Sequence, residues 1–103
     1  MSGTSENEFA KAAVRIASSQ PNGIASHRRL RAEIPKLIKL NTADLDSSQT
    51  RKNEPMWHQI VRNIKSHDKD AGNFIAEGYL EHVLRVGYRV TPKGRALLAS
   101  GKI

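Results

Sequence analysis

The sequence of 103 residues contains no cysteine. Without a thiol, the chain can form no disulfide, no cysteine-ligated zinc or iron–sulfur site and no thiolate nucleophile. It also lacks an uninterrupted apolar run long enough to cross a bilayer, and its start, MSGTSENE, has neither the basic nor the apolar region of a secretion signal. We therefore expect a cytoplasmic protein with no membrane partner.

The chain is too short to build two hydrophobic cores. Neither an internal repeat nor a long linker interrupts it, and the most polar stretch, residues 46–53, has the length of an ordinary surface loop. We expect one domain over residues 1–103, with an ordered core over about residues 5–100.

Motifs of catalysis are missing too. The sequence has no nucleophile elbow, Walker loop or glycine-rich dinucleotide turn. His58 and His67, the nearest pair of histidines, are nine residues apart and not at the four-residue spacing of helical metal ligands. We therefore expect no metal, no cofactor and no enzymatic activity from this chain by itself.

Positive charge is what the sequence has in excess. Seventeen Lys and Arg stand against ten Asp and Glu, for a formal net charge of +7. Residues 21–67 contribute +5 of it, from nine basic and four acidic side chains, whereas residues 1–20 are balanced. An imbalance of this kind favours polyanionic partners such as nucleic acid, and it locates the candidate contact surface in the middle of the chain.

Apolar periodicity predicts two helices in the first forty residues. One covers about residues 5–19, and a second begins after the capping residue Ser26 and runs over about 27–39. Pro35 removes a backbone donor, so we expect a kink or break near it, with the apolar residues that follow still packing inward. The two apolar residues between these helices, 24 and 25, predict a short strand.

A third helix is expected to open at Asn53-Glu54-Pro55, with the asparagine as cap and the proline in the first turn, and to reach His67. At 100° per residue its apolar side chains share one sector of the helix. These core-facing residues are Trp57, Ile60, Val61 and Ile64.

The last third predicts a β-hairpin followed by a short helix. Alternating residues over 79–84 and 88–90 predict two strands, joined by Arg85-Val86-Gly87 with the glycine in the left-handed conformation. Thr91-Pro92 reads as the cap and first residue of a closing helix.

This order predicts a mainly α fold with a small β-hairpin: a winged helix-turn-helix, in which the hairpin is the wing and residues 24–25 add a third strand. The hairpin needs support from the helices, because two strands alone are marginally stable in water. The expected core is Phe9, Ala13, Ile16, Leu30, Ile34, Leu37, Trp57, Ile60, Val61, Ile64, Ile75, Leu80, Tyr88, Val90 and Leu97.

The outer face of the third helix is the sharpest candidate site. The major groove of B-DNA admits one α-helix, and its base edges are read by Arg, Lys, Asn, Gln and Ser side chains. An ordinary solvated helix face is the alternative interpretation. The exposed set contains the required donors and no carboxylate: His58, Gln59, Arg62, Asn63, Lys65 and Ser66.

Phosphate contacts are expected from basic residues around that helix. Arg51 and Lys52 directly precede it. The second helix opens with His27, Arg28, Arg29 and Arg31. Positive charge at a helix N-terminus opposes the helix dipole, so these residues need a reason other than helix stability, such as contact with a backbone phosphate. Of these four we single out Arg28 and Arg29. Arg85 and Arg89 of the wing are expected to make positioning contacts.

Three stretches together resemble a known family. They are TRKNEPMWHQIVRNIKSH at residues 50–67, with Gly72-Asn73 after it, AEGYLEHV at 76–83 and GYRVTPKGRALL at 87–98. Over roughly residues 24–98 the chain resembles the N-terminal winged-helix domain of Mrr-type restriction endonucleases and related domains found beside HNH nucleases.

The resemblance implies a module that binds double-stranded DNA while a separate C-terminal domain cuts it. It places the family's recognition helix on residues 55–67, with Gln59, Arg62, Asn63 and Ser66 toward DNA. The chain ends at Ile103, where such an enzyme continues into its nuclease, so the resemblance implies target recognition without cleavage by this chain. The chain is then either a fragment of a longer protein that contains a nuclease domain or a free-standing DNA-binding protein.

Two other readings stay open. One is a winged-helix transcriptional regulator. The other is a protein-interaction winged helix that docks a partner or forms a homodimer, and Val14, which lies off the apolar centre of the first helix, is its candidate surface residue.

Overall fold

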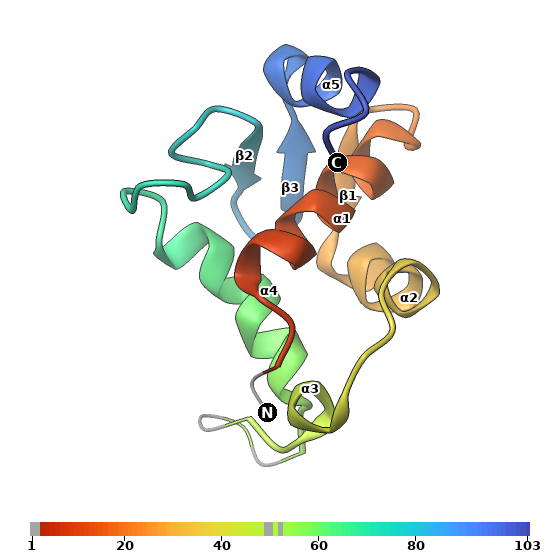
Figure 1. Cartoon of the computed structure of the whole chain (residues 1–103), viewed down its shortest axis with the longest axis vertical. Helices are drawn as coiled ribbons and strands as arrows, with labels where there is room; N and C mark the ends of the chain where they lie inside the picture. Colours follow the sequence, from red (N-terminus) through yellow and green to blue (C-terminus); the bar gives the residue numbers. More distant parts are fainter. Residues whose placement is uncertain (1–2, 49–50, 52) are drawn as a thin grey trace.

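The computed structural model describes residues 3–48, 51 and 53–103 of the chain. Over these residues it forms five helices and a three-stranded antiparallel sheet (Figure 1). In chain order the elements are α1 (Glu6–Ser18), β1 (Ile24–Ser26), α2 (His27–Leu37), α3 (Thr42–Leu45), α4 (Met56–Ser66), β2 (Leu80–Val83), β3 (Gly87–Val90) and α5 (Pro92–Ala99).

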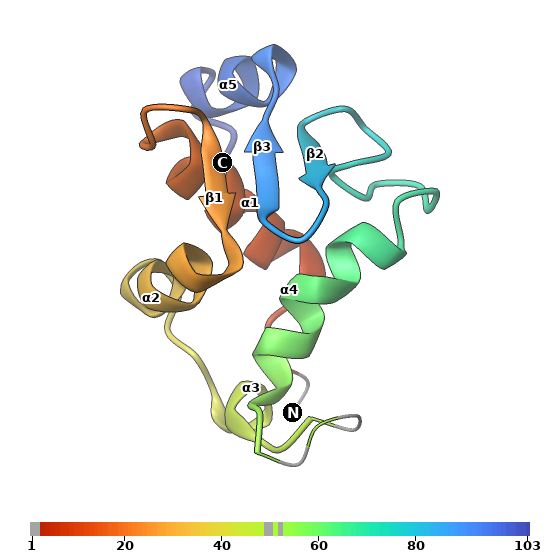
Figure 2. The same cartoon turned by 180° about the vertical axis from the view of Figure 1, so that it is seen from behind.

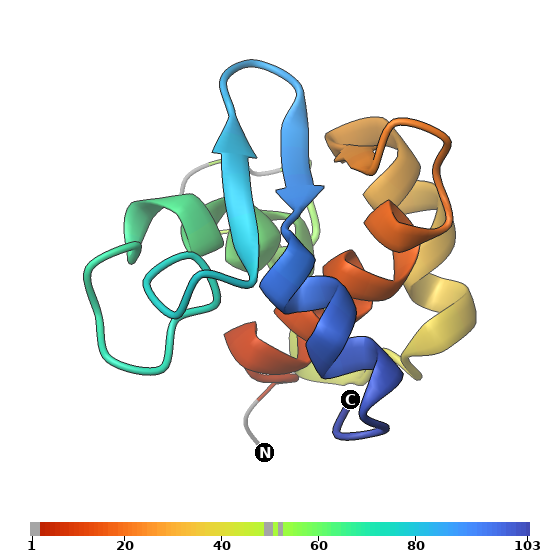
Figure 3. The same cartoon turned by 90° about the horizontal axis from the view of Figure 1, so that it is seen from above.

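The sheet has the order β1-β3-β2, so β3 is its central strand (Figure 2). β1 pairs with β3 from Ile24 opposite Arg89 to Ser26 opposite Gly87, and β2 pairs with the other edge of β3. The predicted hairpin and the predicted short third strand are therefore both confirmed. Seen from above, the hairpin stands between α2 and α4 and projects beyond them (Figure 3).

The turn of the hairpin differs from the prediction. Arg85, with φ of 63°, is the residue in the left-handed conformation, and Gly87 belongs to β3. Gly87 is required for another reason, because a Cβ at this position would lie 2.0 Å from the carbonyl oxygen of Ala25 on β1. The glycine thus permits the close approach of two backbones, which the sequence pattern of a hairpin does not reveal.

α1 is the centre of the core. It crosses one face of the sheet and contacts α2, α4 and α5 (Figures 1 and 2). Its side chains are buried on more than one side for this reason, and Val14 is completely inaccessible. The expectation that Val14 extends a dimer surface was therefore wrong.

α2 starts directly after β1, where the Ser26 hydroxyl accepts a hydrogen bond from the Arg29 amide at 3.0 Å, as predicted. The helix continues through Pro35 and ends at Leu37, two residues before the expected end. Leu37 follows the apolar periodicity but is 51% exposed, so its place in the predicted core was wrong. Ile38, in extended conformation, packs against the core instead.

α3 was not predicted. Asn41 and Asp44 form a reciprocal capping box around it, and the buried carboxylate of Asp44 also accepts hydrogen bonds from the Thr4 amide and hydroxyl, each at 2.6 Å. Burial opposes ionisation of Asp44, but these hydrogen bonds outweigh it and lower the pKa. This four-residue helix therefore links the N-terminal segment to the region that precedes α4.

α4 carries the predicted apolar face: Trp57, Val61 and Ile64 are buried. The helix begins after Pro55 and has no side-chain cap, so the expected cap role of Asn53 was wrong. The buried Tyr88 hydroxyl of β3 donates to the Val61 carbonyl oxygen at 2.6 Å and fixes α4 against the sheet. None of the helices in the described part of the chain has the length and apolar character needed to cross a membrane.

Candidate nucleic-acid interface

A cleft lined by basic side chains lies between α2 and α4. It has a volume of about 210 Å³, and one of its lining residues, Val61, is apolar. Figure 2 shows the two helices, with the turn between β2 and β3 ending near α4. We name it the basic cleft; its other lining residues are His27, Arg31, Arg51, His58 and Arg62.

Helical spacing brings these residues together. His27 and Arg31 are four apart and stand on one side of α2, and His58 and Arg62 have the same spacing on α4. Arg51 comes from the loop before α4. The structure therefore gathers three guanidinium groups and two imidazoles from segments up to 35 residues apart in the sequence.

Arg62 is held by a carboxylate of its own chain. It pairs with Glu54, whose other oxygen lies 3.7 Å from Arg51. The side chains of Arg62 and Glu54 are 25% and 12% exposed, so the pair is largely covered. Arg62 was predicted to project freely from α4, and this pairing instead places it at the side of the basic cleft.

Gln59 also has a partner in the loop before α4. Its side-chain oxygen accepts a hydrogen bond from the hydroxyl of the buried Ser48. Gln59 is half-buried as a result. Two of the predicted base-reading residues, Gln59 and Arg62, are thus engaged within the domain.

His27 is one of the residues that line the basic cleft. Its ring packs edge-on against Tyr88, with 5.6 Å between ring centroids. Burial lowers the pKa of His27, and the positive charges of Lys65, Arg31 and Arg62, together with His82, lower it further. The imidazole is therefore neutral at pH 7.

His58 packs edge-on against Trp57, with 4.3 Å between ring centroids. Burial lowers the pKa of His58. Glu54 raises that pKa, whereas Arg31 and Arg62 lower it, and the shift as a whole is downward. The basic cleft thus holds two neutral imidazoles beside three permanent positive charges, with Glu54 as the nearby carboxylate.

Asn63, Lys65 and Ser66 complete the predicted set on α4. Lys65 and Ser66 are exposed and Asn63 is half-buried. By helical spacing Asn63 and Ser66 share the side of α4 turned away from the buried Trp57 and Ile64. They are therefore the candidates on this helix best placed to meet a groove.

The remaining predicted residues do not join the basic cleft. Arg28 and Arg29 are exposed beside a separate depression of about 350 Å³ with Ser26 and Ala32, and Arg29 is 3.4 Å from Glu33. Arg85 is exposed in the hairpin turn, and Arg89 on β3 is 3.6 Å from Glu81. Lys52 lies outside the described residues.

Sequence reasoning singled out Arg28 and Arg29 but not their neighbours His27 and Arg31. A signal for the latter pair was present. Leu30 and Ile34 mark the buried side of α2, and residues 27 and 31 flank that stripe at the same four-residue spacing. Side chains that flank a buried stripe are the ones that border the next helix.

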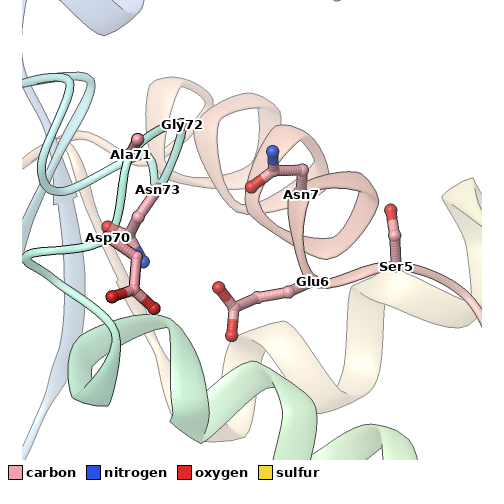
Figure 4. Close-up of a pocket in the computed structure, with 7 residues that line it drawn as sticks. All are labelled: Ser5, Glu6, Asn7, Asp70, Ala71, Gly72 and Asn73. Atoms are coloured by element: carbon pink, nitrogen blue, oxygen red, sulfur yellow. The ribbon is translucent and has the colours of Figure 1, made fainter.

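A second cleft, of about 350 Å³, lies where the start of α1 meets the loop after α4 (Figure 4). The carboxylates of Glu6 and Asp70 point into it from opposite sides. We name it the acidic cleft; its lining residues are Ser5, Glu6, Asn7, Asp70, Ala71, Gly72 and Asn73. His67 lies nearby, with its Nδ1 2.6 Å from a Glu6 oxygen. Across the described residues, His, Asp and Glu side chains form no group of three or more arranged to hold a metal ion.

Comparison of the chain with protein-family models, with curated proteins and with solved structures found no match in any of the three. The resemblance to Mrr-type N-terminal domains therefore stays a prediction. The residues and their geometry are what any functional proposal can use.

Proposed function

We propose that this chain is a winged-helix module that binds double-stranded DNA and has no catalytic activity of its own. The order of helices and strands and the three-stranded sheet support this reading. In it, α2 and α4 are the helix-turn-helix pair, the β2–β3 hairpin is the wing, and α3 is an addition between the two helices.

The observation that carries the proposal is the basic cleft. Three guanidinium groups converge between α2 and the helix that would enter the groove, and Glu54 neutralises only part of their charge. Buried ion-pair networks balance their charges, whereas a surplus of arginine on an open surface suits an anionic partner. Duplex DNA supplies regularly spaced phosphates to such a surface.

In this arrangement the outer side of α4 faces the major groove. Asn63 and Ser66 offer hydrogen bonds to base edges, and Lys65 and Arg31 reach flanking phosphates. Arg62 contacts DNA only by exchanging its bond with Glu54 for one with a phosphate or a guanine. We therefore expect Arg62 to contact a phosphate in preference to a base.

The deciding experiment is titration of a labelled DNA duplex at several salt concentrations. If about four to six phosphates are contacted, log affinity should fall with log salt at a slope of roughly −4 to −5. Absence of binding even at low salt would remove the proposal. A flat salt dependence would also contradict it, because phosphate contacts release counterions.

Two alanine variants separate contacts with the bases from contacts with the phosphates. Asn63→Ala should reduce the preference between duplex sequences with a modest loss of overall affinity. Arg31→Ala should weaken all duplexes to a similar extent and lower the salt slope by about 1. Equal effects of both variants on all sequences would leave α4 without a base-reading role.

The module is also proposed to act together with a nuclease domain. By its resemblance to Mrr-type domains, the module would direct a nuclease domain to its DNA target. Tethering the chain to a non-specific nuclease domain should then concentrate cleavage at preferred sites. Cleavage spread evenly along the DNA would favour a binder without target recognition.

A further inference from the structure

We propose that the basic cleft holds one phosphate group and that His27 and His58 take up protons when it does so. This inference rests on the proposed function, because the phosphate it describes belongs to the DNA backbone. It adds a ligand group, a position and a pH dependence that DNA binding alone does not require.

The chemistry of the lining suits a phosphate. Arg31, Arg51 and Arg62 carry planar guanidinium groups that can form paired hydrogen bonds to phosphate oxygens. The two imidazoles border the same space and have ring nitrogens that donate to an oxygen when protonated. A volume of about 210 Å³ leaves room for one such group with its hydrogen-bond partners.

His27 faces positive or neutral groups from each element around it. Arg31 follows it on α2, Arg62 and Lys65 approach from α4, and His82 from β2. The Tyr88 ring of β3 covers one edge. With no carboxylate acting on it among the described residues, a proton on His27 has nothing to pair with until an anion enters.

His58 has a similar setting with one carboxylate. Arg31 faces it from α2, Arg62 from its own helix and Glu54 from the segment before α4, while the Trp57 ring packs on one edge. Glu54 is already bound to Arg62, so it offsets the surrounding positive charge only in part. An entering phosphate would supply the missing negative charge.

The coupling between phosphate binding and protonation of the two imidazoles has a defined sign. Both imidazoles have a pKa below the ordinary value of 6.5 in the free domain, and a phosphate beside them raises it. Between the free and bound pKa values, binding takes up protons, so DNA affinity increases as pH falls through this range. The positive charges around the imidazoles oppose their protonation, and the negative charge of a bound phosphate offsets that effect.

The experiment measures duplex binding from about pH 7.5 to about pH 5.5 at constant ionic strength, with calorimetry in two buffers of different ionisation enthalpy. We expect proton uptake and a roughly tenfold gain in affinity over this range. The double variant His27→Gln with His58→Gln should lose most of this gain. His67→Gln, the same change beside the acidic cleft, should keep the gain.

Inorganic phosphate is the second arm, followed by NMR of the imidazole resonances. A shift of the His27 and His58 resonances with phosphate alone shows that the cleft accepts a free phosphate; a shift only with duplex shows that it needs the DNA backbone. Duplex binding without proton uptake would overturn the inference and leave the proposed function intact. If no duplex binds, the proposed function fails, and unchanged resonances with phosphate then overturn the inference as well.

Discussion

Two clefts lie near α4, and their lining residues differ in charge. The larger one, about 350 Å³, is lined by Glu6 and Asp70, and the smaller one, about 210 Å³, by three arginines and two histidines. Size alone does not single out either of them, because a hollow lined by Gln20, Pro21 and Val86 is larger than both, at about 370 Å³. The acidic cleft repels a polyanion and the basic cleft attracts one, so the distribution of charge is the better guide to the class of partner.

The two clefts are also built from different parts of the chain. The acidic cleft joins the start of α1 to the loop after α4, and it uses neither β1 nor α2. The basic cleft needs α2 beside α4, and α2 follows β1 without a connecting residue. Its geometry therefore depends on how closely β1 approaches β3.

The largest expected effect is a test of that dependence. Gly87→Ala places a Cβ 2.0 Å from the Ala25 carbonyl oxygen, so β1 and α2 must move or the domain must unfold. We expect a loss of more than about 3 kcal/mol in the free energy of unfolding. Gly72→Ala, in the acidic cleft, meets no described atom within 4 Å but has a φ of 84°. It should cost only about 1 kcal/mol.

Urea unfolding of both variants gives the comparison. Equal stability losses would mean that the β1–β3 contact does not limit the fold. If Gly87→Ala remains folded, its DNA affinity should still fall while Gly72→Ala binds normally, because only the first displaces α2.

The next effect concerns charge at the two clefts. Arg31→Glu and Lys69→Glu make the same change of net charge, one in the basic cleft and one in the exposed loop next to Asp70. We expect a loss of duplex affinity of more than about tenfold for Arg31→Glu and of less than about threefold for Lys69→Glu. Fluorescence titration at fixed salt measures both. Equal losses would show that net charge matters and the location of the basic cleft does not.

A smaller effect is expected at the hydrogen bond that fixes α4. Burial raises the pKa of Tyr88, so its hydroxyl stays protonated and donates to the Val61 carbonyl oxygen. Tyr88→Phe should lower the free energy of unfolding by about 1 kcal/mol. Tyr79→Phe is the control, because its ring contact with Phe74 survives the change. A larger loss from the control would indicate that ring packing, and not the link to α4, dominates.

The smallest expected effect is a difference in the sign with which two histidines make the free energy of unfolding depend on pH. Glu6 raises the pKa of His67, so the stability from this pair is present below pH 6.5 and disappears as pH rises through the raised pKa. The pKa of His27 is lowered, so the folded state loses stability as pH falls below 6.5. Unfolding curves of His67→Gln and His27→Gln at a series of pH values should therefore deviate from those of the parent protein in opposite directions. Deviations of the same sign would contradict the contrast between the two clefts.

Much of the fold follows from local patterns. Ser26 and Thr91 begin helices as their capping chemistry predicts, and the hairpin strands pair where alternation placed them. Two departures, at Val14 and Gly87, involve contacts between elements distant in sequence. Val14 is buried because other helices and the sheet pack around α1. Gly87 permits the close approach of β1 to β3 and is not the left-handed residue of the turn.

The candidate site was predicted only in part. Helical spacing found the polar side of α4, but it could not show that Glu54 binds Arg62 or that Ser48 binds Gln59. Those partners come from a loop whose path has no periodic signal. His27 and Arg31 were passed over in favour of Arg28 and Arg29, although their four-residue spacing beside the buried side of α2 was a signal, and Arg28 and Arg29 line a different depression.

The amino-acid sequence by itself determined the kinds of element, their order and the surplus of positive charge in the middle of the chain, because these depend on near neighbours and on composition. Tertiary structure alone decided which of the positive charges meet. The packing of α2 and α4 on α1 and β3 brings five basic side chains to one cleft and leaves the carboxylates of Glu6 and Asp70 at another. Electrostatic attraction depends on distances in space, and those distances are set by the core.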